Sequence, residues 1–195
     1  KLTRLPFPPD LEPGMKLDGY RIDQALFASS RSQVYLVTDL ETDEQMVMKT
    51  PSLNFQDDVH YIDRFIQEEW IGKRINSEYV VKVITQNRPR TFLYYLMEYV
   101  PGISLDKWMI DHPLPSPKKA ITLVKQIAAA LAAFHNTETI HQDLKPANII
   151  VDDAMKIKVI DFGSVFVAGI AEIFIPIEHL GALGTATYSD PYYLQ

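Results

Sequence analysis

The sequence is organised around residues 141–148, which read HQDLKPAN, and the apolar runs IIV and VIDFG follow within residues 149–163. Such β-branched runs predict short buried strands. The loops beside them carry the carboxylates Asp143 and Asp161 and the amide Asn148. Side-chain oxygens of this kind suit Mg²⁺, which prefers oxygen ligands and shares them with phosphate groups. The stretch therefore predicts a site that handles phosphate.

These residues resemble the protein kinase family. The family catalytic loop reads His-Arg-Asp-Leu-x-x-x-Asn, and residues 141–148 match it except that Gln142 replaces the arginine. Residues 161–163 match the family motif Asp-Phe-Gly in full. Lys145, two residues after Asp143, is similar to the serine/threonine branch of the family. Two motifs in the right order, with a strand-rich segment between them, are more specific than either motif alone.

The resemblance implies an α+β fold of two lobes, with a small antiparallel sheet and one helix in the N-lobe and a mainly helical C-lobe. It predicts a linker or arm over residues 1–14, an N-lobe over 15–97, a hinge over 98–102 and a partial C-lobe over 103–195. The chain stops shortly after the activation segment, so we expect a truncated record. Because residues 1–14 contain four prolines, we also expect an additional domain upstream of residue 1.

Strands are predicted over residues 20–26 and 34–38, joined by a hairpin. In the family this hairpin is the glycine-rich loop over the ATP phosphates. Here Phe27, Ser29 and Ser32 stand at the glycine positions. The resemblance places Ser29, Ser32 and Val34 at the nucleotide, in a polar lid that covers it less closely. An ordinary serine-rich turn is an equally good interpretation of the same residues.

A third strand over residues 45–49 ends in Lys49, which in the family contacts the α- and β-phosphates. The following helix, predicted over residues 57–75, carries two adjacent glutamates. The family spacing points to Glu68 as the partner of Lys49, and Glu69 is then expected to face solvent. The apolar residues assigned to the buried face of this helix are Phe65, Ile66, Trp70, Ile71 and Ile75.

Two further strands are predicted over residues 79–85 and 91–97, and Pro-Gly then breaks the chain. By resemblance Met97 lies at the back of the adenine pocket, and backbone groups of Glu98 and Val100 bind the adenine. Helices are predicted over 105–110 and 115–135, the second with a Ser116 cap. The positions expected to be buried in this second helix are Ile121, Val124, Ile127, Ala128, Leu131 and Phe134.

The activation segment has an unusual composition. Residues 165–183 contain no Ser, Thr or Tyr, and Gln142 replaces the arginine that pairs with a phosphate there in many kinases. We therefore expect either activity that does not depend on phosphorylation of this segment or control by docking of its apolar surface on another domain. Residues 184–192 resemble Gly-Thr-x-x-Tyr-x-Ala-Pro-Glu, with Asp190 and Tyr192 replacing Ala and Glu, and Thr185 is expected to tether Asp143 and Lys145.

Composition excludes several other classes of protein. The net charge is −6 and no basic cluster is present, which argues against nucleic-acid binding. The sequence has no cysteine, which excludes disulfides and thiolate metal sites and fits a reducing compartment. No apolar run is long enough to suggest a membrane span. A cytoplasmic location is expected.

The resemblance implies a serine/threonine protein kinase that uses ATP and Mg²⁺ and acts on a protein substrate. Asp143 would accept the proton of the substrate hydroxyl, Lys145 would offset charge on the transferring phosphoryl group, and Lys49 with Glu68 would bind the α- and β-phosphates. The metal ligands would be Asn148 and Asp161. Two alternatives stay open: a pseudokinase that serves as a nucleotide-binding scaffold, and a kinase-like phosphotransferase acting on a small molecule.

Overall fold

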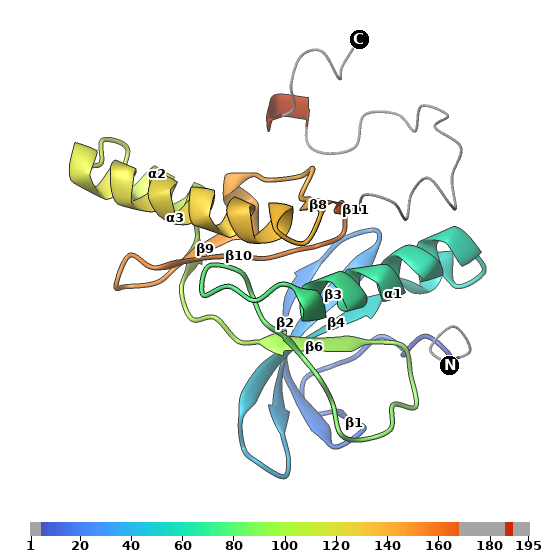
Figure 1. Ribbon diagram of the computed structural model, residues 1–195. Coiled ribbons are helices and arrows are strands. Elements are labelled where there is room, and N and C mark those ends of the chain that lie inside the picture. Colours follow the sequence, from blue (N-terminus) through green and yellow to red (C-terminus); the bar gives the residue numbers. More distant parts are fainter. Residues whose placement is uncertain (1–4, 168–185, 189–195) are drawn as a thin grey trace. The chain divides into compact units, whose positions relative to one another are not determined.

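The computed structural model describes residues 5–167 and 186–188. By its internal contacts the chain divides into two compact units. Unit 1 contains residues 1–73 and 82–99, and unit 2 contains residues 74–81 and 100–195. Within the described part of the chain, no helix combines the length and apolar character that crossing a membrane requires. Figure 1 gives the element labels used below.

Unit 1 is an antiparallel sheet of six strands with one long helix. The strands are β1 (Lys16–Leu17), β2 (Tyr20–Ala28), β3 (Ser32–Asp39), β4 (Gln45–Pro51), β5 (Val83–Ile84) and β6 (Tyr95–Glu98). They lie in the order β1-β2-β3-β4-β6-β5. A 3₁₀ turn, η2 (Leu53–Phe55), leads into the helix α1 (Val59–Arg74). The predicted strands over 20–26, 34–38 and 45–49 are therefore confirmed, each slightly longer than expected.

The core of unit 1 forms where apolar residues of β2, β3, β4 and β6 meet on one face of the sheet. Its fully buried members include Ile22, Val37, Met48 and Leu96. The N-terminal arm joins this core through Leu11, which is 7% exposed. The carbonyl of Pro6 accepts a hydrogen bond from the backbone of Leu93 at 2.8 Å. From residue 5 onward the predicted arm therefore packs on the sheet.

Helix α1 begins where the Asp58 carboxylate accepts a hydrogen bond from the backbone N–H of Tyr61 at 3.0 Å, a typical helix cap. Its buried residues include Phe65 and Ile71. Trp70, which was predicted on the buried face, is 41% exposed. At 100° per residue, Trp70 lies on the opposite side of the helix from Phe65 and Ile71, so the grouping was wrong in that position.

Unit 2 contains two helices and five short strands in its described part. The helices are α2 (Leu105–Asp111) and α3 (Pro117–His135), and the strands are β7 (Ile103–Ser104), β8 (Thr139–Ile140), β9 (Ile149–Val151), β10 (Ile157–Val159) and β11 (Phe166–Val167). Strands β10, β9 and β7 form one sheet, and β11 pairs with β8. Two 3₁₀ turns, η3 (Pro146–Asn148) and η4 (Ala186–Tyr188), complete the set.

The predicted strand over residues 79–85 divides between the two units. Val80 forms a parallel bridge with Val159, and the N–H of Val81 donates to the carbonyl of Val159 at 2.9 Å, both within unit 2. Only Val83–Ile84 pairs with β6 in unit 1. The predicted strand over 91–97 likewise shortens to Tyr95–Glu98. One apolar run thus supplies two different sheets, which its composition did not indicate.

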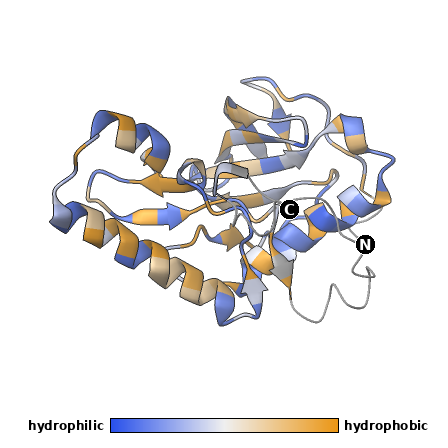
Figure 2. Ribbon diagram, turned by 90° about the horizontal axis from the view of Figure 1, so that it is seen from above, coloured by the Kyte–Doolittle hydropathy of each residue, from blue (hydrophilic) through white to orange (hydrophobic). Residues whose placement is uncertain are grey.

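Helix α3 begins as predicted, because the Ser116 hydroxyl accepts a hydrogen bond from the N–H of Lys119. Its buried side was predicted correctly at Phe134 and incorrectly at Ile121 and Val124. Leu123, Ala130 and Phe134 are buried, whereas Ile121 and Val124 are 54% and 64% exposed. Figure 2 shows why: apolar and polar residues are interleaved along the whole helix, so the hydropathy pattern alone does not single out one face.

Candidate active site

In unit 1, Lys49 and Glu68 form a buried ion pair. Lys49 lies near the end of β4 and Glu68 in the middle of α1, and the Lys49 Nζ to Glu68 Oε1 distance is 2.5 Å. Lys49 is 8% exposed and Glu68 5% exposed. Burial makes this pair electrostatically strong and makes the loss of either partner costly. The ion pair expected from the sequence is present.

The three residues predicted at the lid lie along the β2–β3 hairpin. Val34 pairs with Lys49 in the register of β3 and β4, so one strand pair positions both residues. Ser29 closes the tip of the hairpin: its Oγ accepts hydrogen bonds from the N–H groups of Arg31 at 3.2 Å and Ser32 at 3.0 Å. The N–H of Ser29 donates to the carbonyl of Ser32 at 2.9 Å. Several backbone donors of the lid are therefore bonded within the lid.

The lid is also attached to the rest of unit 1. The Tyr61 hydroxyl, on α1, donates to the carbonyl of Arg31, and the N–H of Ser52 donates to the same carbonyl at 2.9 Å. The Tyr61 ring stacks on Phe55 with centroids 4.7 Å apart. Burial raises the pKa of Tyr61, so its hydroxyl stays protonated as a donor. The lid and the helix that carries Glu68 are thus linked directly.

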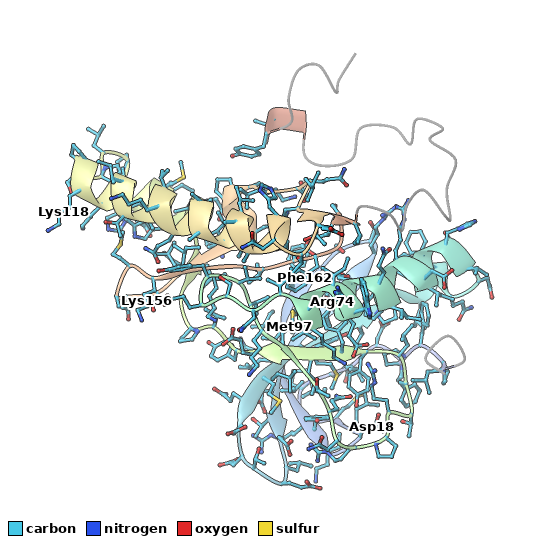
Figure 3. The ribbon with its side chains drawn as sticks, viewed as in Figure 1. Asp18, Arg74, Met97, Lys118, Lys156 and Phe162 are labelled. Carbon is cyan, nitrogen blue, oxygen red and sulfur yellow. The ribbon has the colours of Figure 1, made fainter. Side chains whose placement is uncertain are left out.

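The strand that leads into the predicted hinge is firmly held. Met97 is buried on β6 and pairs with Val47 and Val83 of the neighbouring strands (Figure 3). The N–H of Glu98 donates to the carbonyl of Lys82, and the Glu98 carboxylate accepts from the N–H of Lys82, at 2.9 and 2.8 Å. Val100 follows as the first residue of the second part of unit 2.

In unit 2 the catalytic-loop residues form a compact polar cluster. Lys145 Nζ lies 2.8 Å from Asp143 Oδ2. The Asn148 amide donates to the backbone carbonyl of Asp143 at 2.9 Å and to Oδ2 of its side chain at 3.3 Å. Asn148 is 8% exposed, held in the 3₁₀ turn η3. The carboxylate of Asp143 is therefore fixed from two sides.

The β9–β10 hairpin brings Asn148 and Asp161 to the same end of a strand pair. Ile149 pairs with Val159, and the N–H of Ile160 donates to the carbonyl of Asn148 at 2.8 Å. Asp161 then has a positive φ of 76°, and Gln142 one of 59°. Left-handed backbone is costly for residues other than glycine and is found preferentially at functional sites. Of the six non-glycine residues with a positive φ in the described part of the chain, these two lie in the motifs that the sequence singled out.

Three aromatic rings support this loop from below. Phe134 of α3 is fully buried, and its ring lies 5.1 Å from that of His141 and 6.1 Å from that of Phe162. Burial lowers the pKa of His141, although the nearby carboxylates of Asp161 and Asp143 oppose this effect. The buried His141 ring, packed against Phe134, fits a structural role at the start of the loop.

The donor set of Asp161 and Asn148 fits a magnesium ion, because Mg²⁺ typically binds one or two carboxylates and takes its remaining ligands from water and phosphate. A metal site made by protein side chains alone is of a different kind. Across residues 5–167 and 186–188, no three His, Cys, Asp or Glu side chains gather into such a site.

One prediction about the site was wrong, and one lies outside the described residues. Glu69 does not face solvent: it is 5% exposed and forms ion pairs with Lys73 and Arg90. No sequence signal indicated its partner Arg90, which lies 21 residues away. The expected tether Thr185, with Asp190 and Tyr192, falls outside the described part of the chain.

Comparison with known proteins agrees with this geometry. The family model for the protein kinase domain matches residues 20–193. Serine/threonine-protein kinase PknL of Mycobacterium tuberculosis is 30% identical over 178 residues, which are 90% of this chain and 43% of that protein. Serine/threonine-protein kinase PrkC of Bacillus subtilis is 29% identical over 151 residues, 77% of this chain and 23% of that protein. The chain thus spans less than half the length of these relatives.

A crystal structure of the Mycobacterium tuberculosis PknI kinase domain is also similar, with a TM-score of 0.63 and 26% sequence identity over 80% of this chain and 64% of that one. This similarity confirms the kinase-like fold that the sequence predicted, including the antiparallel sheet of the N-lobe. On the family match, the relatives and the structure together, the chain belongs to the eukaryotic-like serine/threonine protein kinase family.

Proposed function

We propose that this chain is the catalytic part of a serine/threonine protein kinase that transfers the γ-phosphoryl group of ATP to protein hydroxyls. The observation that carries the proposal is the Asp143 cluster: a carboxylate held 2.8 Å from Lys145 and fixed by Asn148, next to the strand end that bears Asp161. Kinases at about 30% identity support the same chemistry.

The residues take distinct roles in this proposal. Asp143 accepts the proton of the substrate hydroxyl and orients that group. Lys145 offsets negative charge beside it, and Lys49, held by Glu68, binds the α- and β-phosphates. Asn148 and Asp161 hold Mg²⁺, which supplies charge neutralisation when bound. Positioning and charge neutralisation provide most of the rate in reactions of this kind.

The proposal extends to the organisation of the chain. We assign the N-lobe to residues 15–97, the hinge to 98–102 and the C-lobe to the residues from 103 on. In the hinge, Met97 lies behind the adenine, and backbone groups of Glu98 and Val100 bind it. Ser29, Ser32 and Val34 contribute the lid. The activity is expected in the cytoplasm, where ATP and Mg²⁺ are supplied.

Transfer of radiolabelled γ-phosphate from ATP by the full-length protein tests the proposal. We expect labelled protein with the wild type, and a loss of at least about a hundredfold in Asp143→Ala and in Asp161→Ala, as for removal of a general base. Asp153→Ala serves as the matched control, because Asp153 is an exposed aspartate on the β9–β10 turn. Equal labelling by the wild type and the two site variants would refute the assignment.

A pseudokinase is the second candidate, because the lid bonds its own N–H groups through Ser29 and Gln142 replaces the catalytic-loop arginine. It predicts that nucleotide raises the unfolding temperature while no phosphate is transferred. Label that appears on a soluble metabolite and never on protein would instead support a kinase-like small-molecule phosphotransferase.

A further inference from the structure

Helix α1 carries a second buried glutamate immediately after the one that pairs with Lys49. The Glu69 carboxylate forms ion pairs with Lys73 at 2.7 Å and with Arg90 at 3.0 Å. Lys73 is one turn further along the same helix, whereas Arg90 lies on the segment between β5 and β6. Of these two bonds, the one to Arg90 attaches the helix to another part of unit 1.

The segment that bears Arg90 is itself anchored. Arg90 donates a second hydrogen bond to the carbonyl of Tyr94, and its side chain is 12% exposed. The next residue, Thr91, donates from its N–H and its hydroxyl to the carboxylate of Asp18, at 2.8 and 2.7 Å, on the turn between β1 and β2 (Figure 3). Arg90 is therefore a fixed point for α1 to bind.

Two bonds from adjacent residues constrain a helix more than one bond does. Glu68 and Glu69 point about 100° apart around the helix axis. Tyr61 and the buried residues Phe65 and Ile71 also attach α1 to unit 1, but the ion pairs of Glu68 and Glu69 are the two that a rotation of the helix about its axis would have to break together. Breaking the Glu69–Arg90 pair leaves Glu69 with Lys73, but it takes the carboxylate away from the largely buried Arg90 guanidinium, which is costly in a protein interior.

We propose that the Glu69–Arg90 ion pair positions the catalytic machinery by holding α1 in the rotation that keeps Glu68 on Lys49. Glu69 and Arg90 are positioning residues in this inference, which rests on the proposed kinase function. Because Glu69 and Arg90 both belong to unit 1, contacts within that unit set the position of Glu68. Such built-in placement fits a chain whose activation segment has no phosphorylatable residue between Val165 and Leu183.

Steady-state kinetics of the full-length protein test this role. Arg90→Gln should lower kcat about tenfold or more, since small misplacements of catalytic groups cost one to two orders of magnitude. Arg90→Lys, which keeps the charge, should restore most of the rate. Lys73→Gln is the matched control, because it removes the other partner of the same carboxylate without detaching α1 from the segment between β5 and β6. It should leave kcat near the wild-type value.

A double variant separates positioning from general stability. If Arg90 acts through Glu68, then Arg90→Gln should cause little further loss of kcat in a protein that already carries Glu68→Gln. If the fold-loss of kcat in the double variant equals the product of the losses in the two single variants, Arg90 acts independently of Glu68. That result would overturn the inference. Thermal unfolding of the same variants shows whether each protein is folded at the assay temperature, and Glu69→Gln, which changes the other side of the same ion pair, replaces Arg90→Gln if that variant does not fold.

Hydrogen exchange over residues 59–74 supplies a readout that needs no activity. Exchange should become faster in Arg90→Gln and stay unchanged in Lys73→Gln. Unchanged exchange and unchanged kcat in Arg90→Gln would overturn the inference and leave the kinase assignment intact. If the wild type transfers no phosphate but exchange responds as stated, the proposed function fails while the role of Glu69 and Arg90 in holding α1 stands.

Discussion

At the scale of single residues, the lid shows how a substitution can be accommodated by local bonding. Glycine at these positions would leave backbone N–H groups open to a phosphate. Here the Ser29 hydroxyl accepts hydrogen bonds from the N–H groups of Arg31 and Ser32. These two backbone donors of the lid are therefore already bonded when no ligand is bound. Nucleotide must compete with this hydroxyl, which predicts weaker binding than an open glycine loop would give.

Ser29→Gly should therefore strengthen the binding of Mg·ATP. Hydrogen bonds to a charged phosphate contribute about 1 kcal/mol more than bonds between neutral groups, which corresponds to about a fivefold gain in affinity. Titration calorimetry measures the change. Ser30→Gly is the control for added flexibility, because the Ser30 hydroxyl makes no hydrogen bond within the described residues. Equal affinities for wild type and Ser29→Gly would contradict this account of the lid.

The sequence predicted the contacts among its motif residues better than it predicted the contacts that support them. Lys49, Glu68, Asp143 and Asn148 belong to motifs with fixed spacing, and the structure gives each of them a bonded partner. Glu69 was misjudged because its partner Arg90 lies on another element. An ion pair between residues far apart in the sequence leaves no periodic pattern. The sequence shows that a residue is charged, but it does not show whether that residue is exposed or buried against a partner.

At the scale of helices and strands, a prediction from the sequence was correct where the order of apolar and polar residues allowed only one interpretation. Strands β2, β3 and β4 were each predicted as an apolar run between turn segments, and all three were found. Helix α3 was located correctly, but it is apolar on two sides, so Ile121 and Val124 were assigned to the wrong one. Periodicity measures the presence of an apolar face, while tertiary packing decides which face is covered.

Gly102 is the residue on which the sheet of β7, β9 and β10 depends most directly. Its φ is +145°, and a Cβ added there would contact the carbonyl group of Val151, with its carbon at 2.9 Å. Gly102→Ala should therefore lower the free energy of unfolding of unit 2 by about 2–5 kcal/mol, from backbone strain together with overpacking. Urea unfolding followed by the emission of the buried Trp108 on α2 measures the loss.

Gly14→Ala is the matched control for that experiment. Gly14 also has a positive φ, of +92°, but nothing lies within 4 Å of an added Cβ. The alanine there should cost only the left-handed backbone conformation, about 1–2 kcal/mol. If the two substitutions proved equally costly, close approach to Val151 would not be the reason for glycine at position 102.

At the scale of the whole molecule, the sequence bears on how the activity would be controlled. Phosphorylation of an activation segment acts by creating one to three charge-assisted hydrogen bonds with basic residues. The catalytic loop offers the uncharged Gln142, and residues 165–183 offer no hydroxyl to modify. The two halves of the switch are absent together from the sequence. Within unit 1, Glu68 and Glu69 of α1 form ion pairs with Lys49 and Arg90.

The full-length protein should consequently keep its rate of phosphoryl transfer after exhaustive phosphatase treatment. The physical reason is that residues 165–183 have no hydroxyl that could carry a phosphate, and that the catalytic loop has Gln142 in place of the arginine that would bind one. Gln142→Arg provides the control: restoring the cation alone should leave the rate insensitive to phosphatase, because the acceptor is still missing. Phosphate content by mass spectrometry verifies the treatment. A large loss of rate in the wild type would place control at an acceptor outside residues 165–183, such as Thr187, and the predicted independence from phosphorylation would be wrong.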